Sequence, residues 1–247
     1  MNSIPIICYS HSTYSDVWDI FFGQLEKYFP NNKKYLFTDS VVKDIPKDVE
    51  VILYDDKLSY SKRLSSCLSK LEEDIVLFHH EDMILYDKPN VEKLNELYNF
   101  LKTYEIDYIK LLKGGHDFDV PLDNMPVDNL YWIPHDGKKL SFAIQPTIWK
   151  VDKFLEICNN SGESNLVGNV AVGDFELYAS KFVDNSDLNG LYWYAGEDKR
   201  GSSHWDSSIY PHGNFIFKGK WVYSEYENEL NSLHKVYNID KNNRGVV

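Results

Sequence analysis

The first 112 residues alternate between short apolar runs and stretches with helical spacing. β-branched and aromatic residues fill the apolar runs, and polar residues end them. Between these runs, apolar residues recur at intervals of three and four, as on one face of a helix. Strands that alternate with helices in this way form βαβ units, so the sequence predicts an α/β fold with a mixed, mostly parallel, Rossmann-like sheet flanked by helices. The predicted strands span residues 4–9, 34–38, 50–54, 75–79 and 108–112.

The second half of the chain is less regular. Residues 117–129 are acidic and contain proline, which predicts a loop, and 130–133 with 140–143 predict a hairpin. We further expect helices from Val151, from near Asp174 and from Ser224, with aromatic β-like segments over 191–221. We interpret the chain as a single domain, 1–247, with a regular half (1–113) and a specialised half (114–247).

Composition excludes several classes of partner. A net charge of −12 over 247 residues disfavours nucleic acid and anionic membrane surfaces, which reward basic proteins. The three cysteines lack zinc-type spacing, and we expect reduced thiols. Since no run approaches the roughly 18 apolar residues of a membrane span and the start lacks a signal-peptide pattern, we expect no integral membrane segment and a soluble, cytoplasmic protein.

Polar residues follow the first three predicted strands, where parallel strands share one edge of a sheet. Open α/β sheets bind ligands at that edge. Carboxylates there can accept hydrogen bonds from a nucleobase and from ribose hydroxyls, so we expect a nucleoside site. The alternative is that each residue only forms a turn or caps a helix. The candidates are Ser10, His11, Asp39, Asp55 and Asp56.

Two cations, Lys62 and Arg63, stand at the start of the helix that follows the third strand. The helix dipole disfavours cations at this end, so their position needs another cause. A diphosphate held at the helix start would provide one, and two solvated surface charges are the alternative.

The fourth strand ends in His79-His80-Glu81-Asp82. A carboxylate pair beside imidazoles suits Mn²⁺ or Mg²⁺, with Asp82 as ligand and Glu81 behind it or against a sugar. The second ligand must come from elsewhere, and His204 and His212 are the candidates. A polar strand end with capping carboxylates is the alternative interpretation.

Asp174 and Glu176 lie near the start of a predicted helix. The dipole there keeps a carboxylate ionised, which suits a general base acting on a hydroxyl. Acidic residues are also simply favourable at helix starts.

Several segments together resemble nucleotide-sugar-dependent glycosyltransferases of the GT-A fold, especially the small single-domain enzymes of viral and bacterial surface-glycan pathways. Asp82 stands where these enzymes carry the last carboxylate of their acidic metal motif. The other similar segments are Tyr60–Leu64, Gln145–Trp149, Gly173–Glu176, Tyr210–Asn214 and Lys218–Trp221.

The resemblance implies a metal-dependent hexosyl- or deoxyhexosyltransferase that moves a sugar from a nucleoside-diphosphate sugar to a hydroxyl of a glycan or glycoconjugate acceptor. Residues 1–113 would bind the donor and 114–247 the acceptor. Asp82 with His212, or His204 in its place, would hold Mn²⁺ or Mg²⁺. The resemblance also implies a base at Asp174 or Glu176, charge at the diphosphate from Lys218 and Lys220, and acceptor contacts from Gln145, Trp149 and Trp205.

Two other functions stay open. A sugar-1-phosphate nucleotidyltransferase should carry a glycine-rich basic loop after its first strand, and residues 10–15 contain neither glycine nor lysine. The degenerate acidic motif also leaves a non-catalytic nucleotide- or glycan-binding module of the same fold as an alternative.

Overall fold

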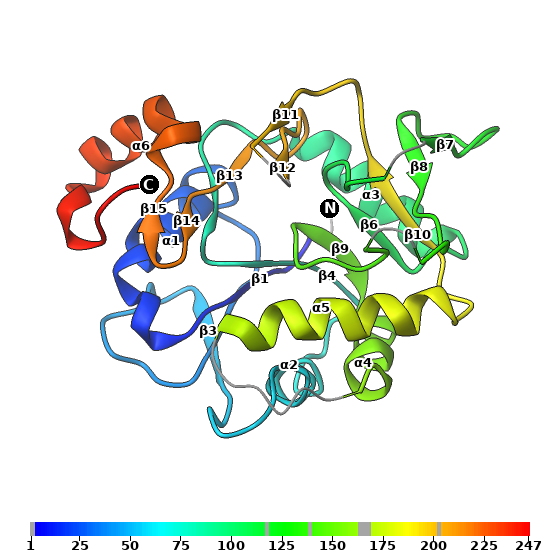
Figure 1. The fold of residues 1–247 in the computed structure, drawn as a ribbon, viewed down its shortest axis with the longest axis horizontal. Coiled ribbons are helices and arrows are strands. Elements are labelled where there is room, and N and C mark those ends of the chain that lie inside the picture. The colour runs from blue at the N-terminus through cyan, green and yellow to red at the C-terminus, as the bar shows by residue number, and fades with distance from the viewer. Residues whose placement is uncertain (1–2, 117–118, 138–139, 163–168, 202–203) are drawn as a thin grey trace.

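The computed structural model describes residues 3–116, 119–137, 140–162, 169–201 and 204–247. Within this part of the chain, nine strands form one sheet in the order β3-β2-β1-β4-β9-β6-β10-β8-β7, with helices on both of its faces (Figure 1). The strands are β1 (Ile6–Tyr9), β2 (Lys34–Thr38), β3 (Val49–Leu53), β4 (Ile75–His80), β6 (Tyr108–Lys110), β7 (Val120–Pro121), β8 (Leu130–Trp132), β9 (Thr147–Lys150) and β10 (Gly190–Trp193).

The sheet is mixed and mostly parallel, as the sequence predicts. Strands β3, β2, β1 and β4 are parallel neighbours, which is the order of a Rossmann-type half. Strand β9 runs antiparallel between β4 and β6, and β8 runs antiparallel to β10. Because β1 and β4 are in register at Tyr9 and His80, the polar residues that follow them reach the same edge.

Each face of the sheet has its own apolar core. Helices α1 (Trp18–Tyr28), α3 (Val91–Thr103) and α6 (Tyr223–Tyr237) cover one face. Helices α2 (Tyr60–Leu68), α4 (Val151–Asn160) and α5 (Asn169–Asp184) cover the other. Strand β1 is therefore buried on both sides, which explains its continuous apolar sequence.

The second half differs from the prediction at three places. Strand β8 pairs with β7 and β10, and residues 140–144 form no strand, so the expected hairpin is wrong. Strand β9 lies in the segment that the sequence suggested as an acceptor site. Helix α5 begins at Asn169, before the expected start near Asp174. The first two differences arise because β8 and β9 pair with strands that are distant in sequence, and a local sequence pattern does not reveal such pairing.

Three short ribbons and a tail lie beside the carboxyl edge of the sheet (Figure 1). The ribbons pair β5 (Met83–Leu85) with β13 (His212–Asn214), β11 (Lys199–Arg200) with β12 (His204–Trp205), and β14 (Ile216–Phe217) with β15 (Lys220–Trp221). The tail returns to β15, where the N–H of Val247 donates to the carbonyl of Trp221 at 2.9 Å. Short 3₁₀ turns occur at η1 (Ser12–Val17) and η2 (Lys241–Asn243). None of the described helices has the length and apolar character to cross a membrane.

Candidate active site

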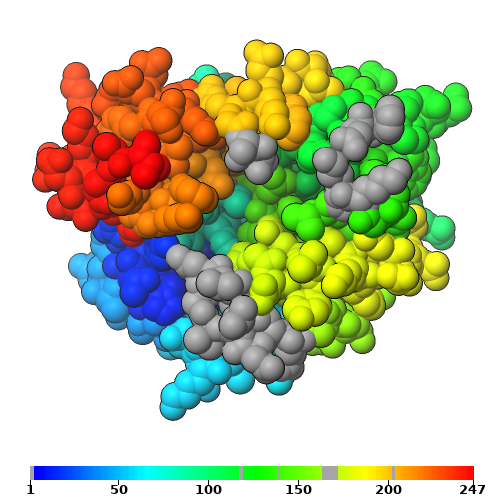
Figure 2. Space-filling model, viewed as in Figure 1, coloured from blue at the N-terminus to red at the C-terminus, as the bar shows by residue number. Residues whose placement is uncertain are grey.

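A cavity of about 1000 Å³ opens at the carboxyl edge of the sheet, in the hollow at the centre of the face seen in Figure 2. Its volume is in the range of small-molecule binding sites. The sheet, α5 and the three ribbons all contribute to its wall. Polar residues of the wall include Lys110, His116, Gln145, Glu176, His204 and His212.

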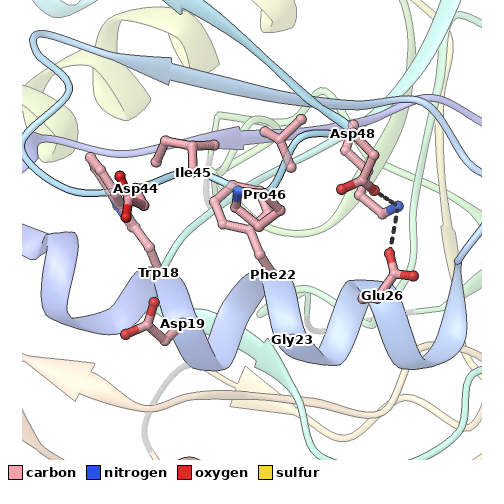
Figure 3. A pocket seen from close by; sticks show the side chains of 11 residues that line it. Trp18, Asp19, Phe22, Gly23, Glu26, Asp44, Ile45, Pro46 and Asp48 are labelled. Atoms are coloured by element: carbon pink, nitrogen blue, oxygen red, sulfur yellow. Dashed lines mark hydrogen bonds and ion pairs between the residues drawn. The ribbon is translucent and has the colours of Figure 1, made fainter.

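A smaller pocket lies between α1 and the connection from β2 to β3 (Figure 3). It measures about 280 Å³, and Trp18 and Phe22 line it. Its buried cation, Lys34, is already neutralised by Asp48 at 2.5 Å and Glu26 at 3.4 Å. The buried cation of this pocket is therefore already balanced, and the larger cavity at the carboxyl edge of the sheet is the candidate site.

The turn after β4 buries two adjacent carboxylates, Glu81 and Asp82, whose ionised forms repel each other. Burial raises the pKa of Glu81, and the adjacent charge of Asp82 raises it further. Burial likewise raises the pKa of Asp82 to about 7, and the charge of Glu176 adds to this effect. The Oδ1 atom of Asp82 is buried without a hydrogen-bond partner among the described residues. A bound cation would relieve both the repulsion and the unpaired oxygen.

The donor atoms suit a divalent ion that is shared with a substrate. Mg²⁺ in proteins commonly binds one or two carboxylates together with substrate phosphates, and Asp82 can supply such a carboxylate. Within the described ranges, no three His, Cys, Asp or Glu side chains gather as a protein-made metal cage. A site for Mn²⁺ or Mg²⁺ at Asp82 would therefore take its remaining ligands from a substrate, and metal binding here stays a prediction.

The two candidate histidines, His204 and His212, differ in whether the Nε2 atom of the ring already has a hydrogen-bond partner. The Nδ1–H of His212 donates to the carbonyl of Tyr210 at 2.7 Å, which leaves Nε2 as a buried acceptor without a partner among the described residues. The Nε2–H of His204 is used, since it donates to the carbonyl of His212 at 3.2 Å. His212 lines the cavity and Asp82 does not, and the β5–β13 register pairs His212 with Leu85. Joint ligation by Asp82 and His212 stays a prediction.

Helix α5 presents Glu176, rather than Asp174, among the residues that line the cavity. Burial raises the pKa of Glu176, while hydrogen bonding from the backbone of Ile144 and the charge of Lys110 oppose that rise. Asp174 is partly buried one position before Phe175, which packs into the core. A carboxylate with a raised pKa beside a cavity is the stronger candidate for a general base.

The ends of the first three strands do come together. His11 Nε2 lies 3.8 Å from Oδ2 of Asp39 and 3.5 Å from Oδ1 of Asp56. Asp39 also accepts hydrogen bonds from the backbone N–H of Ser12 at 2.7 Å and from its hydroxyl at 2.8 Å. Burial works against ionisation of Asp39, yet these hydrogen bonds leave its pKa below the ordinary value. The predicted polar edge is therefore present.

Two residues predicted to contact the nucleotide are used inside the protein instead. Ser10 is fully buried, and its hydroxyl accepts a hydrogen bond from the Trp18 indole at 2.7 Å. Arg63 donates to the carbonyl of Leu58 at 2.8 Å and pairs with the Asp56 carboxylate at 2.8 Å. The loop before α2 thus explains a cation at that helix start without any phosphate.

Other predicted donor-side residues lie at the surface. Asp55 accepts the N–H of Lys57 at 2.9 Å, which is a turn contact. Lys62 is exposed on α2. Lys218 occupies the turn of the β14–β15 hairpin with a φ of 50°, and Lys220 is exposed in β15. The neighbouring Phe217 lines the cavity, so the hairpin borders the site.

The acceptor-side predictions divide into two groups. Gln145 lines the cavity, and its Oε1 is buried without a partner among the described residues. Trp205 also lines it, with the Lys199 ammonium 5.0 Å from its ring centroid. Trp149 is a correction, because it lies in the core between Tyr108 at 4.2 Å and Phe154 at 4.6 Å and is 2 % exposed. It cannot stack on a sugar.

The structure adds site residues that sequence reasoning missed. The charge of Arg244, in the tail, opposes the rise that burial causes in the pKa of both Glu81 and Asp82. Its side chain also donates to Asp16 at 2.6 Å. Nothing in the polar tail sequence marks Arg244. Lys110 ends β6 at the carboxyl edge, so the strand-end argument used for the aspartates would have found it.

The fold and the cavity define an α/β protein with a Rossmann-type half and a carboxylate-lined cleft at the carboxyl edge of its sheet. No protein-family model matches the sequence, and no curated protein matches it.

Among solved structures, the chain is similar to S. aureus TarS residues 1–349, with 14 % identity, 77 % of this chain and 60 % of that chain covered, and a TM-score of 0.46. For the same protein in complex with UDP-GlcNAc, the identity is 13 %, the match covers 80 % of this chain and 60 % of that chain, and the TM-score is 0.47. For the bifunctional IspDF from Campylobacter jejuni, the identity is 13 %, the match covers 70 % of this chain and 46 % of that chain, and the TM-score is 0.38. The chain thus spans at most 60 % of these structures, and scores below 0.5 carry no functional assignment.

Proposed function

We propose that this protein is a glycosyltransferase that moves a sugar from a nucleoside-diphosphate sugar to a hydroxyl of a glycan or glycoconjugate. One observation carries the proposal. Glu176, on α5, lines the cavity together with Met83, the residue that follows Asp82 in the turn after β4. The carboxylates of Asp82 and Glu176 thus come from the two halves of the chain to the same cavity, and the charge of Glu176 adds to the raised pKa of Asp82. Beside a cavity of about 1000 Å³, this pair suits a reaction between a donor anion on one side and a hydroxyl on the other.

The donor would occupy the edge formed by the ends of β1 to β4. His11, Asp39 and Asp56 offer hydrogen-bonding groups for a base and ribose. Asp82 and His212 would hold Mn²⁺ or Mg²⁺, which when bound stabilises negative charge on the leaving diphosphate. Arg244 lies near the same acidic turn and would add positive charge there.

Glu176 would act as the general base. Its Oε1 is fixed by the N–H of Ile144 at 2.6 Å, so the carboxylate is oriented before a substrate binds. The acceptor hydroxyl would pass its proton to Glu176 as its oxygen attacks the sugar and the bond to the diphosphate breaks. Burial of Glu176 increases its basicity for this step.

A donor panel tests the proposal. The purified protein with Mn²⁺ should release nucleoside diphosphate from at least one member of a nucleotide-sugar panel, and faster with an acceptor mixture. A chelator or the substitution Asp82→Ala should abolish this release. The control Asp152→Ala, which removes an acidic side chain on α4 outside the cavity, should not. Turnover of a nucleoside triphosphate with a sugar 1-phosphate instead would support a nucleotidyltransferase and refute the proposal.

A further inference from the structure

Lys110 is a buried cation at the base of the cavity. It ends β6 with 3 % of its surface exposed, and it lines the cavity wall. No hydrogen bond joins its ammonium group to another described side chain, and burial lowers its pKa to about 8 while the charge of Glu176 opposes that fall. A buried ammonium group is costly unless charge and hydrogen bonds compensate it.

The other cations of the wall are different. Arg200 is already neutralised by Glu229 at 2.6 Å and by Asp206 at 3.2 Å. Lys199 is exposed and sits over the Trp205 ring. Lys110 therefore supplies the buried charge that the cavity itself leaves available to a ligand.

His116 accompanies Lys110. It is 5 % exposed, and both of its ring nitrogens are buried without a partner among the described residues. Burial lowers its pKa to about 4, so the neutral ring offers one N–H donor and one acceptor. A methyl group at Gly114 would lie 2.9 Å from both His116 Nε2 and Lys110 Nζ, which shows that the two groups converge on this glycine.

The position of this pair separates it from the donor side. The charges that act on Asp82 are those of Glu176 and Arg244, whereas the charge that acts on Lys110 is that of Glu176. In the sheet, strand β9 lies between β4, which leads into the acidic turn, and β6, which ends at Lys110, so Lys110 is two strands away from the donor edge of β1 to β4. If Asp82 faces the donor diphosphate, Lys110 and His116 face the acceptor.

We propose that Lys110 and His116 form a subsite for an oxyanion carried by the acceptor, either a carboxylate of an acidic sugar or a phosphate of a phosphorylated glycan. This inference rests on the proposed function, which supplies the acceptor. The charge balance favours it during the reaction, because Glu176 becomes neutral when it takes the acceptor proton. The ammonium group of Lys110 then has a negative charge near it only if the acceptor carries an oxyanion. The attraction between Lys110 and that oxyanion therefore strengthens as the reaction proceeds.

The test measures binding without a donor. Titrations of the whole chain with glucuronate, glycerol phosphate and neutral methyl glucoside, followed by calorimetry, compare the two oxyanions with an uncharged sugar. We expect at least one oxyanion to bind about tenfold more tightly than methyl glucoside, as for one charge-assisted hydrogen bond. Which oxyanion does so identifies the acceptor chemistry.

Variants assign the effect to the subsite. Lys110→Met and His116→Gln should remove the preference for the oxyanion, and Lys150→Met, on the neighbouring strand β9 at the opposite edge of the sheet, should keep it. Gly114→Ala should weaken it by pushing the two side chains apart. If Lys110→Met fails to fold, His116→Gln and Gly114→Ala carry the test.

A parallel titration with UDP and Mn²⁺ separates this inference from the proposed function. Equal binding of the three acceptor probes, or a Lys110→Met variant that loses UDP and keeps the oxyanion, would overturn the subsite. A protein that binds no nucleoside diphosphate at all would instead contradict the proposed function.

Discussion

The Oε1 atom of Glu176 accepts a hydrogen bond from the backbone N–H of Ile144 at 2.6 Å. This contact joins α5 to the segment before β9 and fixes one carboxylate oxygen at the cavity wall. The side chain therefore has a defined orientation, which a general base needs before its substrate arrives.

Glu176→Gln should lower kcat by about 10²- to 10⁴-fold, because the amide keeps the side-chain shape and cannot take a proton. Asp174→Asn should stay near the activity of the wild-type protein, since Asp174 is not among the residues of the cavity wall. Steady-state rates with matched thermal unfolding curves check both variants. Equal losses in the two variants would contradict the assignment of the base.

The stability of the metal-free protein should depend on Asp82. Burial raises its pKa to about 7, so between pH 4 and 7 the folded chain binds more protons than the unfolded chain. Stability from this group is present at low pH and is lost as the pH rises through 7. Asp82→Asn should therefore raise Tm at pH 8 relative to wild type and have little effect at pH 4. Unfolding curves across this range in chelator test it, and a Tm difference that does not vary with pH would count against a raised pKa.

Metal use should separate the two histidines. His212 retains a free Nε2 acceptor, whereas the Nε2–H of His204 is committed to a backbone carbonyl. We expect His212→Ala to raise the Mn²⁺ concentration needed for half-maximal activity by about 10- to 100-fold, and His204→Ala to change it much less. Activity titrated with Mn²⁺ measures this directly. The opposite order would assign the ligand to His204.

The first half of the fold was readable from sequence because its signals are local. Each buried strand is a run of β-formers, so β1 to β4 lie close to the predicted ranges, and helices with a periodic apolar face occur between them as expected. Strand β9 shows the limit. Its residues Thr147–Lys150 pair with β4 and β6, and no local pattern states that a strand will be inserted there.

The site residues show the same contrast between positions set by local sequence and contacts set by tertiary structure. Asp39 and Asp56 could be placed from sequence because parallel strand ends must meet at one edge. Whether a polar group is already hydrogen-bonded inside the protein depends on tertiary contacts, which is why the internal partners of Ser10 and Arg63 were not predicted. Arg244 reaches the acidic turn from the far end of the chain, and such a contact has no sequence signature.

The two tryptophans predicted to contact the acceptor should respond differently to truncation. Trp149 is 2 % exposed and packs against Tyr108 and Phe154, so Trp149→Ala should destabilise the fold by about 3–5 kcal/mol through the cavity it leaves. Trp205 is partly exposed on the wall, so Trp205→Ala should change stability by less than about 1 kcal/mol. It should instead raise KM for the acceptor and leave KM for the donor unchanged, because Trp205 lines the cavity from the half of the chain that we expect to bind the acceptor. Urea unfolding and initial rates with each substrate varied in turn measure the two effects. A folded Trp149→Ala protein of normal stability would show that the aromatic stack on Tyr108 contributes little to the core.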